Sequence, residues 1–332
     1  MLRRGNRDAS AGKYESAIKR YDEALNINPR NAALYYNRGH VWHIMGELDN
    51  AVNDYTKALE VNKEYVDAYH SRGMALFKKS NYDLAISDFT KALQLNPDNY
   101  SKIGLYFNRA YAWFKVGDYD RAIDDYTESI RIGGITKITP TDKAEAYYFR
   151  AKAWYEKANF ENAISDYTKA IDINAKYAQA LFDRANIWHE KREYASAIID
   201  YENAIELDPK NAHAYNNYSW LLSTCPDSRL RNGAKALKLA LKAVELNPDE
   251  AFFFDTLAAA YAELENFKQA VQAVERAITL LEKDNKENLK ESLLPQLEFY
   301  KAGKPWREDV KREEWMRKYK IKEPQKEGIS GQ

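Results

Sequence analysis

The sequence is short of three features that would each point to a particular class of protein: cysteine, a surplus of one charge and long apolar runs. Cys225 is the only cysteine in the 332 residues, so no internal disulfide can form. Lys and Arg number 50, and Asp and Glu also number 50, so there is no basic excess to neutralise phosphates and no nucleic acid partner is expected. No stretch approaches the roughly 20 apolar residues of a membrane span, so we expect no membrane-spanning helix.

Signals for catalysis are also missing. The 13 glycines form no phosphate-binding loop, and Cys225 has no histidine at a catalytic spacing. We therefore expect a protein that is not an enzyme and has no cofactor.

What the sequence has instead is an internal repeat. A small residue recurs with apolar residues four and seven places later, as in Ala51, Tyr55 and Ala58. The leading alanines are separated by 34, 34, 37, 41, 34, 39 and 34 residues. They are Ala17, Ala51, Ala85, Ala122, Ala163, Ala197, Ala236 and Ala270. A period of 34 is typical of stacked helix-turn-helix units, and repetition along the chain predicts one elongated array.

Each repeat unit is predicted to be a pair of helices. Tyr35, Gly39 and Trp42 stand at i, i+4 and i+7 on a first helix, and the alanine pattern repeats this spacing on a second. Second helices are expected to end before Pro29, Pro97, Pro209 and Pro248, since proline cannot continue a helix.

These residues resemble the tetratricopeptide-repeat family, which has small residues at the eighth and twentieth places of a unit and an aromatic at the twenty-fourth. The resemblance implies an all-α, right-handed α-solenoid of about eight repeats with a C-terminal capping helix. It covers 1–284, with a partial unit near 1–31 and units at 32–65, 66–102, 103–143, 144–177, 178–211, 212–250 and 251–284. We expect a capping helix over 285–303, kinked at Pro295, and a charged tail over 304–332.

The resemblance also implies that first helices line a concave groove, and that a ligand meets the second, fifth, sixth, ninth, twelfth and thirteenth residues of each unit. These places are rich in aromatic rings, histidines and amides. The candidate peptide-binding residues are Tyr36, Asn37, His40, His43, His70, Phe77, Phe107, Asn108, Phe114, Tyr148, Tyr155, Phe182, Asn186 and Asn217. Rings provide contact area, and amides can hydrogen-bond the backbone of an extended peptide. Packing of each ring between repeats is an equally weighted alternative.

Arginine recurs at the seventh place, beside the packing face, as in Arg38 and Arg72. We expect these arginines to pair with carboxylates of neighbouring units rather than to bind a ligand.

The sequence thus predicts a protein-protein interaction scaffold that holds a peptide or protein segment in its groove. Two alternatives stay open: a recruiting arm of a larger enzyme or assembly, and a solenoid that binds a metal or small ligand through His40, His43 and His70. The oligomeric state is not indicated. No hydrophobic signal core follows Met1, so we expect a cytoplasmic protein. Aligned on later units, however, Met1 falls inside a first helix, and a signal peptide upstream of it would make the protein periplasmic or exported.

Overall fold

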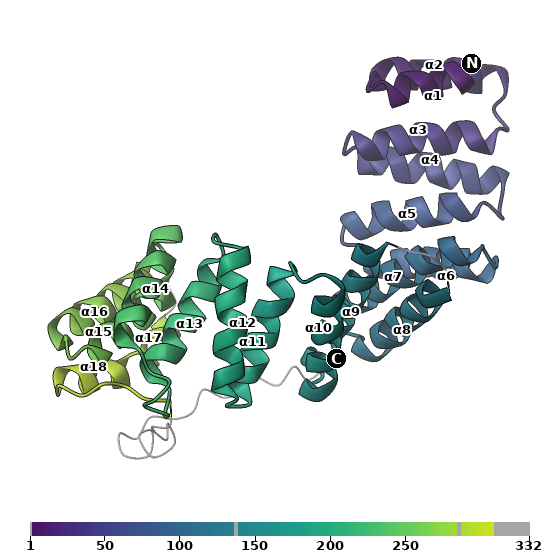
Figure 1. Ribbon diagram of the computed structural model, residues 1–332. Coiled ribbons are helices and arrows are strands. Elements are labelled where there is room, and N and C mark those ends of the chain that lie inside the picture. Colours follow the sequence, from purple (N-terminus) through teal and green to yellow (C-terminus); the bar gives the residue numbers. More distant parts are fainter. Residues whose placement is uncertain (1, 136–138, 284–286, 309–332) are drawn as a thin grey trace. The chain divides into compact units, whose positions relative to one another are not determined.

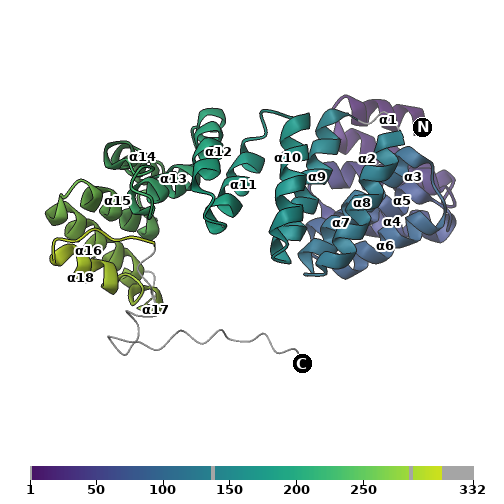
Figure 2. The ribbon, with the colours of Figure 1, turned by 60° about the horizontal axis from the view of Figure 1, so that its bottom comes forward.

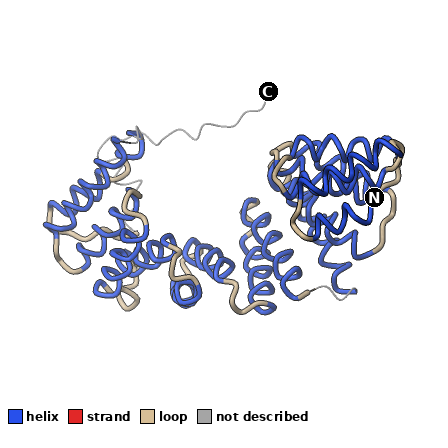
Figure 3. Tube along the Cα trace, turned by 90° about the horizontal axis from the view of Figure 1, so that it is seen from above, coloured by secondary structure: helices blue, strands red, loops and turns tan. Residues whose placement is uncertain are grey.

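The computed structural model describes residues 2–135, 139–283 and 287–308, and within these ranges the secondary structure is helical, with no strand. Figure 3 shows helices joined by short loops. The chain divides into a first unit, Met1–Ala175, and a second unit, Lys176–Gln332. The all-helical solenoid class predicted from the repeats is confirmed.

The first unit consists of five helix pairs (Figure 1). Its helices are α1 (Leu2–Ser10), α2 (Tyr14–Ile27), α3 (Ala32–Ile44), α4 (Leu48–Val61), α5 (Val66–Lys78), α6 (Tyr82–Gln94), α7 (Asn99–Lys115), α8 (Tyr119–Ile135), α9 (Pro140–Glu156) and α10 (Phe160–Ile173). Each first helix packs on its own second helix, and α1, α3, α5, α7 and α9 also contact one another in sequence. First helices therefore form a continuous layer along this unit (Figure 2).

The second unit has three full pairs and a C-terminal addition. Its helices are α11 (Ala178–Glu190), α12 (Tyr194–Leu207), α13 (Ala212–Thr224), α14 (Gly233–Leu246), α15 (Ala251–Glu263), α16 (Phe267–Lys283), α17 (Glu287–Lys290) and α18 (Leu294–Lys301). The first helices α11, α13 and α15 again contact one another in sequence.

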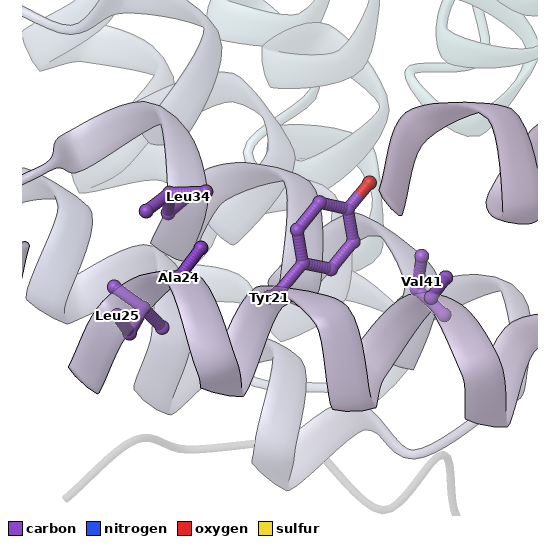
Figure 4. Packing of buried hydrophobic residues seen from close by; sticks show 6 residues of the cluster. Tyr21, Ala24, Leu25, Leu34 and Val41 are labelled. Carbon is purple, nitrogen blue, oxygen red and sulfur yellow. The ribbon is translucent and has the colours of Figure 1, made fainter. Parts of the chain in front are cut away.

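The repeated small residues make the pairs close-packed. Ala17, Ala51 and Ala85 are fully buried, and an aromatic ring four residues later is buried against each. Figure 4 shows Tyr21 in the first of these clusters, with Ala24, Leu25, Leu34 and Val41 around it. In the first unit the buried residues thus form several small clusters spaced along the array.

Two insertions lengthen helices rather than loops. The three residues Tyr100–Lys102 extend the start of α7, where the Asp98 side chain accepts from the backbone N–H groups of Tyr100 and Ser101. The second insertion contains Gly133 and Gly134, and α8 continues through both glycines to Ile135.

The end of the chain differs from the single kinked helix predicted over 285–303. The described part of that range forms α17 and α18, which are separated by a turn. Pro295 lies in the first turn of α18, where its missing N–H needs no partner, so it starts a helix instead of kinking one. Leu297 and Tyr300 are buried, and α18 packs on α16. The charged tail predicted for 304–332 lies outside the described residues from 309 onward.

Candidate functional site

The candidate groove residues all lie on first helices, but they differ in how much of each side chain is accessible. His40 and Tyr155 are exposed, whereas Tyr148 and Phe182 are only 6% and 9% exposed. The other ten are half-buried: Tyr36, Asn37, His43, His70, Phe77, Phe107, Asn108, Phe114, Asn186 and Asn217. A ligand cannot make extensive contact with the rings of Tyr148 and Phe182, which serve as packing.

Most candidate rings also pack on a second helix. The Phe107 ring meets Tyr126 at a centroid distance of 5.5 Å, and Phe77 meets Tyr82 at 5.2 Å. The Tyr36 ring lies between those of Tyr55 and Tyr65, at centroid distances of 5.8 and 5.1 Å, and Tyr65 comes just before the next repeat. The half-buried rings therefore join the packing of the repeats and present only an edge or one face to a ligand.

Two pairs of candidate polar groups bridge neighbouring first helices. The Asn108 amide nitrogen on α7 lies 2.8 Å from Nε2 of His70 on α5. In the second unit, the Asn217 amide donates to the Asn186 oxygen at 2.9 Å. These amides form cross-helix hydrogen bonds, so the expected amide row is partly engaged within the protein.

His70 behaves as a neutral acceptor in this arrangement. Burial lowers the pKa of His70, and its Nε2 faces the Asn108 amide nitrogen, which can only donate. Among residues 2–135, 139–283 and 287–308 there is no group of three or more His, Cys, Asp or Glu side chains that could hold a metal ion. Among these residues, His40, His43 and His70 therefore do not form the metal site that was one of the alternatives.

The thiol of Cys225 is also unsuited to nucleophilic chemistry. Its side chain is buried, and burial raises the pKa of the thiol.

None of the helices in the described ranges combines the length and the apolar character that a membrane span requires.

The seventh-place arginines are structural, but their partners correct our expectation. Arg72 holds both carboxylate oxygens of Asp88, at 2.8 and 2.7 Å, and Asp88 belongs to the second helix of the same repeat. The same pair, sixteen residues apart, recurs from repeat to repeat. It joins Arg38 to Asp54, Arg109 to Asp125, Arg150 to Asp166 and Arg184 to Asp200. A carboxylate of a neighbouring unit is a partner for Arg38, which also pairs with Asp22 of the preceding repeat, but the recurrent partner lies within the same repeat.

A cavity on the first-helix face of the first unit was missed by the sequence analysis. It has a volume of about 190 Å³ and is lined by Tyr100, Ile103, Gly104, Phe107, Ser129, Asp142 and Glu145. Phe107, Gly104 and Glu145 stand at the fifth and second places, which the resemblance assigns to ligand contact.

The sequence makes this cavity in two ways. Gly104 has no side chain, and a methyl group there would touch only His70, at 4.0 Å. The three inserted residues add an exposed aromatic ring, that of Tyr100, beside it. The insertion and the glycine were the signals that could have located the cavity. Asp142 and Glu145, both exposed, give its rim negative charge.

Comparison with known proteins agrees with the repeat architecture. One family model described as a TPR repeat matches residues 5–46, and others described as tetratricopeptide repeats match 32–65, 66–99, 107–178, 178–211 and 200–236. No curated protein matches the chain.

Three solved structures illustrate the structural similarity. The C-terminal part of a TPR repeat-containing protein from Cytophaga hutchinsonii has a TM-score of 0.62 at 18% identity, over 77% of this chain and 99% of that one. A tetratricopeptide-repeat protein from Parabacteroides merdae has a TM-score of 0.56 at 16% identity, over 79% and 98% of the two chains. YrrB, described as a TPR protein with an unusual peptide-binding site, has a TM-score of 0.51 at 20% identity, over 59% and 96%.

At these identities the structures establish the fold alone. The family models, however, together match residues 5–99 and 107–236, which is more than half of the 332 residues. The chain belongs to the tetratricopeptide-repeat family.

Proposed function

We propose that this protein is a non-enzymatic interaction scaffold that binds a peptide or protein segment on the first-helix face of its first unit. The observation that carries the proposal is the cavity beside Phe107. It combines two aromatic side chains, those of Phe107 and Tyr100, with two exposed carboxylates, those of Asp142 and Glu145. Such a wall suits the long apolar stem and charged tip of a lysine or arginine side chain.

Two further observations support a peptide ligand. The layer of first helices from α1 to α9 is continuous, so an extended segment can contact several repeats at once. The Asn108 amide beside the cavity has two N–H donors, only one of which is needed for His70, so the other can serve a peptide carbonyl. YrrB, which shares the fold, is described as binding peptide at an unusual site, and this is consistent with such use.

The test is selection of displayed random peptides against the full chain, followed by measurement of Kd for the enriched sequences. We expect enrichment of peptides with a basic residue. Replacing both rim carboxylates, Asp142→Asn with Glu145→Gln, should weaken binding about tenfold, because each solvent-exposed ion pair contributes up to about 1 kcal/mol. Added salt should weaken binding to the wild type and have less effect on the variant.

A matched control keeps the change of charge and moves it away from the cavity. Asp83→Asn with Asp124→Asn removes two exposed carboxylates from the second helices α6 and α8. This control should bind like the wild type. Peptides that bind the rim variant and the wild type equally would refute the role of the cavity, and a failure to enrich any peptide would refute the scaffold proposal.

A further inference from the structure

The segment Trp306–Glu308 of the chain lies on the first-helix face of the second unit. Gly303, with a φ of +66°, ends α18, and Pro305 prevents the helix from continuing. The segment Trp306–Glu308 then returns to α13. The Arg307 guanidinium donates to the carbonyl of Ser223 at 3.1 Å, and the Glu308 N–H donates to the carbonyl of Thr224 at 3.2 Å. Both carbonyls are at the end of a helix, where they lack a helical partner.

Side chains of the segment also have specific partners. The Trp306 ring packs edge-on against Phe299 with a centroid distance of 5.2 Å. Arg307 pairs with Glu263, at 2.5 Å, and Glu263 is only 14% exposed. Three consecutive residues, one aromatic, one basic and one acidic, are thus each held by the second unit.

The Glu308 carboxylate contacts side chains of both α11 and α13. Its Oε1 lies 2.7 Å from Nε2 of His189 and 3.3 Å from the hydroxyl of Thr224, and its side chain is 20% exposed. The Trp220 and Tyr194 side chains also lie beside it. Burial raises the pKa of Glu308, but the hydrogen bond and charge of His189, with smaller contributions from Trp220 and Thr224, bring it below its ordinary value.

The groups that enclose this carboxylate stand at places assigned to ligand contact. His189 is at the twelfth place of its repeat, and Trp220 and Thr224 are at the ninth and thirteenth places of the next. An indole N–H can only donate, so a negatively charged acceptor suits the place beside Trp220. If the segment left, His189 would lose its partner, whereas the Thr224 hydroxyl would keep its hydrogen bond to the Trp220 carbonyl at 2.8 Å.

We propose that this face of α11 and α13 is a receptor for a glutamate side chain, which Glu308 fills in cis. An acidic peptide from a partner, with a basic residue before its glutamate, takes the same place when Trp306–Glu308 is displaced. The basic residue pairs with Glu263, as Arg307 does. The segment is therefore an internal competitor for the site. The inference uses only contacts of the second unit and does not depend on the cavity beside Phe107.

The first experiment tests whether the segment is seated in the full chain. Trypsin cleaves after Arg307 only when the segment leaves its site, because a protease needs an extended, accessible substrate. Glu308→Gln should accelerate this cleavage at least about fivefold, as followed by mass spectrometry. Glu298→Gln, which changes an exposed carboxylate of α18, should leave the rate unchanged. Equal rates in wild type and Glu308→Gln would overturn the proposal.

The second experiment tests recognition in trans. The probes are a fluorescent peptide, Gly-Lys-Pro-Trp-Arg-Glu with an amidated end, and the same peptide with glutamine replacing glutamate, at protein concentrations up to about 1 mM. The Glu308→Gln protein should bind the glutamate peptide at least about tenfold more tightly than wild type does. It should also prefer the glutamate peptide to the glutamine peptide.

Trp220→Phe, combined with Glu308→Gln, removes the indole donor while keeping a ring and should abolish the preference for glutamate. Equal binding of the two peptides by the Glu308→Gln protein, or no binding, would overturn the receptor. A wild-type chain that dimerises, with cleavage after Arg307 accelerated by dilution, would assign the segment to a second copy and overturn occupation in cis.

Discussion

The two units use the same surface differently. In the first unit, the first-helix face contains a cavity of about 190 Å³ with acidic groups at its rim. In the second unit, the ends of α11 and α13 contact the chain's own Trp306–Glu308. The same repeat pattern can therefore leave its first-helix face accessible to a ligand or have that face covered by a segment of its own chain.

The units also differ in what lies beneath the surface. The first unit has a buried arginine-aspartate pair in each repeat from α3 to α10, and the second has one in its first repeat, between Arg184 and Asp200. In the later repeats Tyr218 and Leu257 replace the arginine. There α18 covers the end of the array and encloses Asp255, which accepts a hydrogen bond from Gln296 at 3.2 Å. The repeated arginine-aspartate pair is thus a feature of the inner repeats, whereas the later repeats have a different pairing, in which Arg231 and Arg307 both contact Glu263.

Removal of one buried arginine should produce the largest effect. Arg72→Ala leaves Asp88, whose side chain is 7% exposed, without its bidentate partner. We expect a loss of about 3–5 kcal/mol in the free energy of unfolding, measured with urea and circular dichroism. Arg131→Ala, which removes an arginine from an exposed pair, should change little. A loss of less than about 1 kcal/mol for Arg72→Ala would show that the buried arginine-aspartate pairs do not stabilise the inner repeats.

The buried carboxyl of the second unit should make stability depend on pH. Burial raises the pKa of Asp255 from 3.8 to about 7. Because the folded-state pKa is the higher one, the stabilisation is complete below about pH 4 and is lost as pH rises to about 7, a difference of up to about 4 kcal/mol.

Asp255→Asn should remove this pH dependence and make the variant more stable than wild type at pH 8. Urea unfolding at pH 4 and pH 8 provides the measurement. A wild-type protein whose stability is flat between these values would show that Asp255 has an ordinary pKa.

A smaller effect is expected at the eighth place, which holds glycine in the first three repeats and alanine in several later ones. A methyl group added at Gly73 would lie 2.6 Å from the Phe89 ring, so the ring would have to move. Gly73→Ala should cost about 1–3 kcal/mol. Gly134→Ala, at a helical position where the added methyl meets nothing within 4 Å, is the control and should be neutral or stabilising. If Gly73→Ala and Gly134→Ala both unfolded with the same free energy as the wild type, close packing against the Phe89 ring would not explain why the eighth place holds glycine.

Much of the fold could be predicted because the repeated residues are those with the strongest packing constraints. Ala51 and Tyr55 recur at fixed spacing because both are fully buried. The candidate site was harder to predict. Tyr148 and Phe182 stand at the same place as Phe107, but small differences in burial decide whether such a ring packs or remains accessible. Contact of Glu308 with His189 joins residues 119 positions apart, and no periodicity indicates it.

The sixteen-residue spacing of the arginine-aspartate pairs has a consequence for how such an array can change its length. Both members of each pair belong to one helical hairpin, so a complete hairpin has its buried charges already neutralised. Duplication or deletion of a whole hairpin would strand no buried carboxylate, whereas a break inside one would. Loss or gain of material is therefore least harmful in whole repeats, and charge pairing helps to set the step by which the protein can grow or shrink.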